Sequence, residues 1–283
     1  MVFNLAHLAL KAVKLKSSYT LSSMLIEQLF FYPDSHDYGC KPSSDKFHFE
    51  DIYITLNPHV KIHGWFVPSE DLPKATIIHF HGNAANITNH WEQVSWIPRQ
   101  KYNLFTFDYR GFGQSTGEIR FSGIHDDCLS VIRYVRTKLD NTGKLIILGQ
   151  SIGGAFCVSA VAEDQSKDIK GIILDSCFDS FQNIAIAKLF MIPSSLASLA
   201  SNLLLSDKYS PIRYLDSIKI PKLIIHSESD QVVPFKLGCN LFNSASDPKK
   251  FLSVKHEDHI SFFINRVPEN MSIVFNFLAN CLA

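Results

Sequence analysis

Residues 144–154 contain an apolar, strand-like run that leads directly into the pattern Gly-x-Ser-x-Gly. Gly149, Ser151 and Gly153 form the pattern, and small or apolar residues that suit a helix follow as far as Ala162. A sharp turn from a strand into a helix strains the backbone of its central serine, and glycines on either side remove Cβ atoms that would collide there. The pattern therefore predicts a serine hydroxyl held above the edge of a sheet, and it makes Ser151 a candidate nucleophile.

A second copy of the same pattern lies at residues 113–117, centred on Ser115. Its context differs, because no apolar run precedes it and the charged residues Glu118 and Arg120 follow it. Closely spaced glycines without flanking strand and helix patterns are typical of a loop. We therefore interpret the second copy as a glycine-rich loop.

Short apolar runs separated by helix-length stretches continue along the chain. Unbroken apolarity in a short run indicates a strand buried on both faces, as in a parallel sheet. Residues 47–56 and 60–67 are joined by a turn signal and predict an antiparallel pair, while residues 269–282 predict a closing helix. Together they predict an α/β fold with a mostly parallel eight-stranded sheet and helices on both faces. The predicted buried strands are 76–80, 104–107, 145–148, 171–174, 223–226 and 251–254.

Two segments depart from the alternation of strand and helix. Residues 1–46 precede it and are expected to form a helical segment packed on the core domain of residues 47–283; an amphipathic contact of residues 1–18 with a membrane is the alternative. Residues 181–206 are long, apolar and poor in charge, which favours a small helical cap that lines an apolar pocket. The residues expected to line that pocket are Leu189, Phe190 and Leu196.

Composition excludes several functional classes. Lysine plus arginine and aspartate plus glutamate both number 27 among the 283 residues, so no net charge favours binding to nucleic acid. The six cysteines are scattered singly, without the paired spacing of zinc or redox sites. Reduced thiols are expected, which fits a cytoplasmic protein, with peripheral membrane association as the open alternative.

A serine hydroxyl needs a base within hydrogen-bond reach and an acid that orients the base. On a sheet of this type the acid and then the base follow the serine along the chain. Asp230 lies in the loop after a predicted buried strand, with Glu228 as its competitor. The loop after the last strand offers two histidines, and we favour His259 as the base over His256.

Two backbone N–H groups are candidates to stabilise an oxyanion. One belongs to Ile152, directly after the serine and at the start of the predicted helix. The other belongs to Asn83, in the loop after the strand 76–80, where Gly82 permits a backbone turn.

These motifs resemble the α/β-hydrolase superfamily from about residue 47 to the C-terminus, and residues 81–84 resemble those of small carboxylesterases, monoacylglycerol-type lipases and protein depalmitoylases. The motifs that carry the resemblance are residues 81–84, 108–115, 149–154 and 229–234 and a late histidine.

The resemblance implies that Ser151, Asp230 and His259 form a catalytic triad for a serine hydrolase that cleaves acyl esters or thioesters through an acyl-enzyme. It implies a small acyl substrate, no metal and no organic cofactor, and a structural role for residues 108–115. A serine peptidase of the same superfamily, or a non-catalytic binding protein with this fold, are the alternatives.

Overall fold

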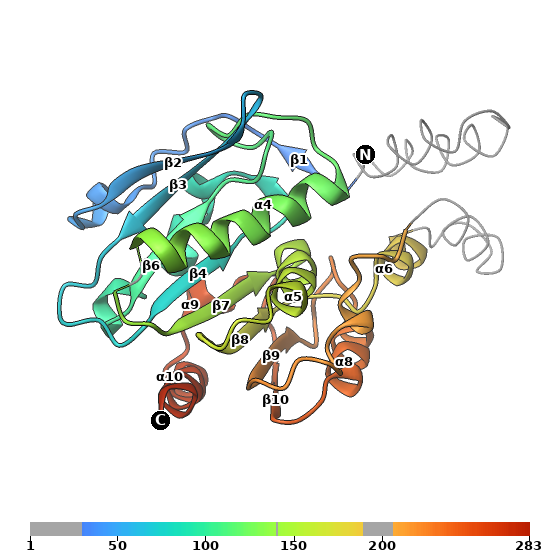
Figure 1. Ribbon diagram of the computed structural model, residues 1–283. Coiled ribbons are helices and arrows are strands. Elements are labelled where there is room, and N and C mark those ends of the chain that lie inside the picture. The colour runs from blue at the N-terminus through green and yellow to red at the C-terminus, as the bar shows by residue number, and fades with distance from the viewer. Residues whose placement is uncertain (1–29, 140, 189–205) are drawn as a thin grey trace, which may run out of the picture.

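The computed structural model describes residues 30–139, 141–188 and 206–283 (Figure 1). The predicted pocket residues Leu189, Phe190 and Leu196, and with them most of the predicted cap, lie outside the described residues. The same holds for residues 1–29, so the packing of that segment and its contact with a membrane stay predictions.

The core of the described chain is a mostly parallel eight-stranded sheet, which confirms the predicted fold class. The strands follow the order β10-β9-β8-β7-β4-β6-β3-β2, and only the pairs β2 with β3 and β3 with β6 are antiparallel. Sequence runs that are apolar throughout occupy the centre of the sheet, where neighbours cover both faces. The strands are β2 Glu50–Asn57, β3 Val60–Val67, β4 Thr76–Phe80, β6 Asn103–Phe107, β7 Leu145–Gln150, β8 Ile169–Asp175, β9 Lys222–Ser227 and β10 Lys249–Val254.

Helices cover both faces of this sheet (Figure 1). Successive residues of a strand face opposite sides, so Ile147 of β7 packs in one core cluster and its neighbours Ile146 and Leu148 pack in the other. One face is covered by α4 Phe121–Tyr134, α5 Ile152–Asp164 and α8 Phe235–Ser244. The other is covered by α3 Ile87–Val94, α9 Phe262–Asn265 and α10 Pro268–Leu282.

Residues 30–46 differ from the predicted helical segment. They contain only the two-residue strand β1 and one short 3-10 helix, and are otherwise irregular. Pro33 and Pro42 interrupt helical hydrogen bonding, and Gly39 adopts a φ of 78°. The remaining short elements are β1 Tyr32–Pro33, η1 Pro42–Asp45, β5 Ala84–Ala85, η2 Pro98–Gln100, the π-helical turn η3 Val135–Leu139, α6 Phe181–Lys188 and η4 Pro211–Arg213.

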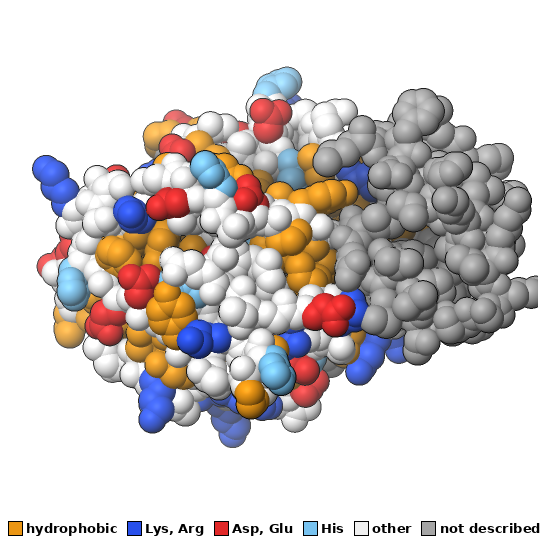
Figure 2. Space-filling view, turned by 90° about the horizontal axis from the view of Figure 1, so that it is seen from above, with side chains coloured by type: hydrophobic (Ala, Val, Ile, Leu, Met, Phe, Trp, Pro, Cys, Tyr) orange, Lys and Arg blue, Asp and Glu red, His pale blue; other side chains and the backbone are white. Residues whose placement is uncertain are grey.

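The parallel strands bring their carboxyl ends to one edge of the sheet, so the loops that follow β4, β7, β8, β9 and β10 lie near one another. Among the described residues, none of the helices combines the length and apolarity needed to cross a bilayer. Viewed from above (Figure 2), the described surface carries acidic and basic side chains interspersed with small hydrophobic areas, in keeping with the balanced charge of the chain.

Candidate active site

The turn between β7 and α5 holds Ser151 in a strained conformation, with φ of 52° and ψ of −122°. Both flanking glycines are required by close packing. A Cβ on Gly149 would lie 2.6 Å from the Cα of Gly154, and a Cβ on Gly153 would lie 2.3 Å from the carbonyl oxygen of Phe80. Non-glycine residues rarely adopt a positive φ, and such strain is concentrated at functional sites.

Ser151, His259 and Asp230 form one continuous chain of hydrogen bonds, although they lie far apart in the sequence. The Oγ of Ser151 is 3.0 Å from Nε2 of His259, and Nδ1 of His259 is 2.8 Å from Oδ2 of Asp230. An ionised carboxylate only accepts, so Nδ1 carries the hydrogen and Nε2 is left free to accept from the serine.

The competing residues lie elsewhere in the structure. His256 is exposed, and its φ of 59° marks the point where the loop turns toward His259. Glu228 is exposed and accepts a hydrogen bond from the hydroxyl of Ser253 at 2.6 Å. The hydroxyl of Ser115 is buried and donates to the carbonyl oxygen of Asp108 at 2.7 Å, as expected for a structural loop.

The environment of Asp230 favours its ionised form. Burial raises the pKa of this carboxyl, but the hydrogen bond from His259 and the N–H groups of Val232 and Val233, both 2.8 Å from Oδ1, outweigh it and lower the pKa. A negative charge directly behind the imidazole stabilises that ring when it takes up a proton.

The turn that carries Asn83 is held rigidly from one side. Each of its four carbonyl groups, from His81 to Ala84, accepts a hydrogen bond from the protein. The donors are the hydroxyl of Tyr109 to His81 (3.0 Å), Nδ1 of His81 to Gly82 (2.8 Å), the N–H of Tyr32 to Asn83 (2.8 Å) and Nε2 of His90 to Ala84 (2.9 Å). With the carbonyl groups fixed, the orientation of the N–H groups of this turn is fixed too.

This turn lies against Ser151. A Cβ built on Gly82 would lie 3.9 Å from the Cβ of Ser151. Within the described part of the chain, the N–H groups of Asn83 and Ile152 have no protein acceptor. Ile152 also begins α5, where the helix dipole favours negative charge. The arrangement therefore offers two uncommitted donors beside the hydroxyl of Ser151.

Several polar residues next to these groups were not found by sequence reasoning. The hydroxyl of Ser227 donates to the carbonyl oxygen of Glu257 at 2.7 Å and so ties the loop of Asp230 to the loop of His259. Asp175 and Ser176, at the end of β8, lie beneath Ser151, whose N–H donates to the carbonyl oxygen of Asp175 at 2.9 Å. No short motif marks them; their one signal is their place at a strand end.

A second serine, histidine and carboxylate also meet, on the helical face of α4 and α5. Nδ1 of His125 is 2.9 Å from Oγ of Ser159, and its Nε2 is 2.9 Å from Glu163. The hydroxyl of Ser159 is buried and donates to a helical carbonyl group, that of Phe156. This cluster stabilises the packing of two helices and offers no access for a substrate.

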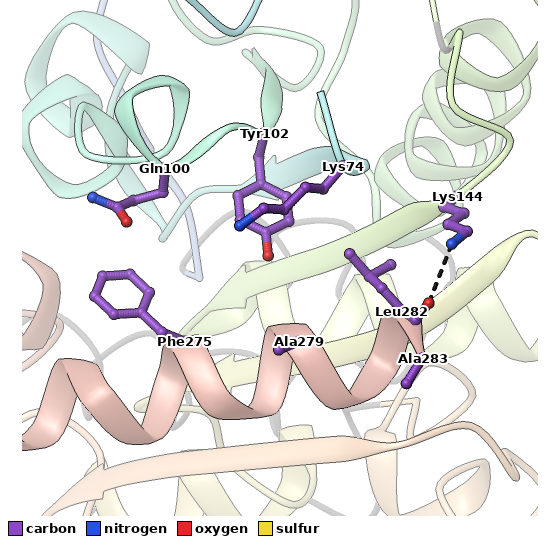
Figure 3. A pocket seen from close by; sticks show the side chains of 8 residues that line it. All are labelled: Lys74, Gln100, Tyr102, Lys144, Phe275, Ala279, Leu282 and Ala283. Atoms are coloured by element: carbon purple, nitrogen blue, oxygen red, sulfur yellow. Dashed lines mark hydrogen bonds between the residues drawn. The ribbon is translucent and has the colours of Figure 1, made fainter. Parts of the chain in front are cut away.

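A hollow of about 450 Å³ lies at the opposite edge of the sheet, where Lys74 precedes β4 and Lys144 precedes β7 (Figure 3). Lys144 donates to the carbonyl oxygen of Leu282 at 3.1 Å, which neutralises the negative end of α10. Lys74 lies over the ring of Tyr102. This hollow is separate from the site of Ser151, because the two lie at opposite ends of the same strands.

Comparison with known proteins places this chain in a wider group. A family model described as "Serine aminopeptidase, S33" matches residues 71–214. The uncharacterized protein YfhR of Escherichia coli O157:H7 is 39% identical over 243 residues, which cover 84% of this chain and 81% of the relative. The lysophosphatidylserine lipase ABHD12 of Danio rerio is 27% identical over 232 residues, which cover 76% of this chain and 60% of the relative.

The fold also has close counterparts among solved structures. The esterase Pf2001 of Pyrococcus furiosus superposes with a TM-score of 0.72, at 18% sequence identity, and the match covers 89% of this chain and all of the esterase. At that identity the likeness concerns the fold.

Proposed function

Because this chain belongs to the serine aminopeptidase S33 family of the α/β-hydrolase superfamily, we propose that it is a serine hydrolase that cleaves acyl esters or thioesters through an acyl-enzyme. The observation that carries the proposal is the hydrogen-bonded chain from Ser151 through His259 to Asp230, with the serine on a strained turn. Chains of this kind activate a hydroxyl that is otherwise a weak nucleophile.

In the proposed reaction, Oγ of Ser151 attacks the acyl carbon while Nε2 of His259 takes the hydroxyl proton. The N–H groups of Asn83 and Ile152 stabilise the oxyanion, and each such donor contributes roughly 2.7–4 kcal/mol in related enzymes. The imidazolium returns its proton to the departing alcohol or thiol. Water, deprotonated by the same ring, then attacks the acyl-enzyme and releases the acid, and the proton passes back to Ser151.

A small ester is the substrate class that the comparisons favour. One matched structure is named an esterase and one relative is named a lysophosphatidylserine lipase. An apolar acyl chain also agrees with the prediction that Leu189, Phe190 and Leu196 line an apolar pocket. The family description names an aminopeptidase, so amide substrates belong in any test.

The experiment is labelling with a fluorophosphonate probe, followed by assays on nitrophenyl esters, acyl thioesters and aminoacyl anilides of graded acyl length. We expect labelling of the wild-type protein, loss of labelling in Ser151→Ala, and turnover of esters or thioesters. The control is Ser115→Ala, which alters the other Gly-x-Ser-x-Gly sequence and should keep labelling. Absent labelling of the folded wild-type protein would favour a non-catalytic role, and turnover of anilides alone would favour a peptidase.

A further inference from the structure

A row of buried polar side chains runs beneath the candidate active site, across neighbouring strands. Nδ1 of His79 is 2.9 Å from the hydroxyl of Thr106, and its Nε2 is 2.9 Å from Oε1 of Gln150. Nε2 of Gln150 donates to Oδ2 of Asp175 at 2.9 Å. All four residues are at most 1% exposed, so water does not compete for these bonds.

The donor-to-acceptor direction of these hydrogen bonds follows from Asp175, at the end of the row. An ionised Asp175 can only accept, so Gln150 donates to it, accepts from His79 at its other end, and leaves Nδ1 of His79 to accept from Thr106. His79 is neutral, because burial lowers its pKa well below the ordinary value. Every donor therefore points toward the carboxylate of Asp175.

From Asp175 the contacts continue into two parts of the candidate site. Its carbonyl oxygen accepts the N–H of Ser151 at 2.9 Å. Its Oδ1 accepts the hydroxyl of Ser176 at 3.1 Å, and that hydroxyl oxygen in turn accepts the N–H of Ile260 at 3.3 Å. Ile260 directly follows His259, so one pair of residues holds both the serine turn and the histidine loop.

The residues joined in this way share a positive φ. Ser151, Ser176 and Ile260 have φ of 52°, 54° and 53°, in a region that side chains with a Cβ disfavour and β-branched side chains disfavour most. Ile260 also lies over the oxyanion turn, since its Cδ1 would be 3.7 Å from a Cβ on Gly82. Strain of this kind persists only where surrounding contacts impose it.

We propose that Asp175 and Ser176 are positioning residues for the reaction, which hold the turn of Ser151 and the loop of His259 at the separation that proton transfer needs. The inference rests on the proposed hydrolase function. Neither residue acts as a catalytic group in it: Asp175 and Ser176 are 1% and 2% exposed, and their side chains are hydrogen-bonded to each other, to Gln150 and to the N–H of Ile260. Their action is through Ser151 and His259.

The charge of Asp175 is part of this role. Burial raises the pKa of its carboxyl to about 6, against the lowering effects of the Gln150 hydrogen bond and of His259, while Asp230 raises it further. His79, the titratable group within the row itself, is neutral. A protonated Asp175 is a weaker acceptor than the carboxylate. The hydrogen bond from the Ser176 hydroxyl therefore weakens, and with it the link to the histidine loop.

The test compares Ser176→Ala and Asp175→Asn with the wild-type protein on the best nitrophenyl ester. Ser176→Ala removes the hydroxyl, but alanine has a Cβ like serine and so faces the same backbone strain at this positive φ. We expect kcat to fall about 10- to 100-fold with KM changed less than about twofold, because small misplacements of reacting groups cost rates of this order. The matched control is Ser159→Ala, which removes an equally buried hydroxyl and should keep kcat within about twofold.

A pH profile separates positioning from a general loss of structure. As pH falls below about 7, log kcat of the wild type should decrease more steeply than that of Asp175→Asn, because only the wild-type residue takes up a proton in this range. A folded Ser176→Ala protein with the kcat of Ser159→Ala, or equal slopes in both profiles, would overturn the inference. If the wild-type protein turns over esters and Ser151→Ala does not, the proposed function stands either way.

Discussion

Asp175→Asn should make the protein more stable at neutral pH while impairing the site. The substitution removes a buried charge but leaves hydrogen bonds that can be rearranged. Gln150 can rotate its amide, neutral His79 can move its hydrogen to Nδ1, and the hydroxyl of Thr106 can turn to accept it. The donor and acceptor roles along the row are then exchanged. The asparagine amide donates to Gln150, while its oxygen still accepts from Ser176.

The magnitude follows from the pKa of Asp175. Its carboxyl has a pKa of about 6 in the folded protein and 3.8 ordinarily, and each pH unit of that difference corresponds to about 1.4 kcal/mol. Between these values the folded state binds more protons at Asp175 than the unfolded state, so the contribution of Asp175 to stability falls as pH rises. The loss amounts to about 3 kcal/mol over the whole titration, of which about 2.4 kcal/mol falls between pH 4 and pH 7. An asparagine does not titrate, so the variant avoids it.

The assay is urea unfolding of both proteins at pH 4 and pH 7. The unfolding free energy of Asp175→Asn minus that of the wild type should increase by about 2.4 kcal/mol from pH 4 to pH 7. Asp127→Asn is the control, because the pKa of Asp127 is also raised to about 6 by burial but its partner, the guanidinium of Arg110, can only donate. The unfolding free energy of Asp127→Asn at pH 7 should be about 3–5 kcal/mol lower than that of the wild type. A difference for Asp175→Asn that is constant with pH, or that decreases, would refute the reasoning.

Three further perturbations address the site directly. Gly153→Ala would place a methyl group 2.3 Å from the carbonyl oxygen of His81, so thermal unfolding should show a loss of at least about 1–3 kcal/mol. Tyr109→Phe leaves that carbonyl without its donor; we expect about 1–3 kcal/mol less stability in urea and a lower kcat with little change in KM. Asp230→Asn should reduce kcat about 10⁴-fold in ester assays. Burial raises the pKa of Asp230, but the hydrogen bond from His259 lowers it more. The stability that this pair adds is therefore present above pH 3.8 and is lost as pH falls through the lowered pKa. When the unfolding free energy is measured at decreasing pH, the difference between the wild type and Asp230→Asn should shrink below pH 3.8.

The parts of the fold that the sequence predicted are those governed by short-range rules. The buried strands were recognisable because residues such as those of β4 and β7 are apolar on both faces, and the turn at Ser151 because its packing tolerates only glycine at Gly149 and Gly153. The preference for His259 over His256 depended on more than local pattern. Both histidines lie in one loop, in which His256 and Ile260 have a positive φ, and His259 is the one that reaches Ser151.

The row beneath the site shows why some side-chain contacts could not be predicted from the sequence. His79 lies in a run predicted to be buried on both faces, and Gln150 and Asp175 follow such runs within two residues; all three are buried, so each needs a buried partner. Which partner depends on strand order and register: His79 pairs across from Thr106, Gln150 pairs across from Asp175, and the row closes only because β4 lies between β6 and β7. A sequence gives the strands in chain order, in which β4, β6, β7 and β8 follow one another. Polar residues in doubly buried strands are therefore a sequence signal that a network exists, and the order of the strands determines that this one ends at Asp175, directly beneath Ser151.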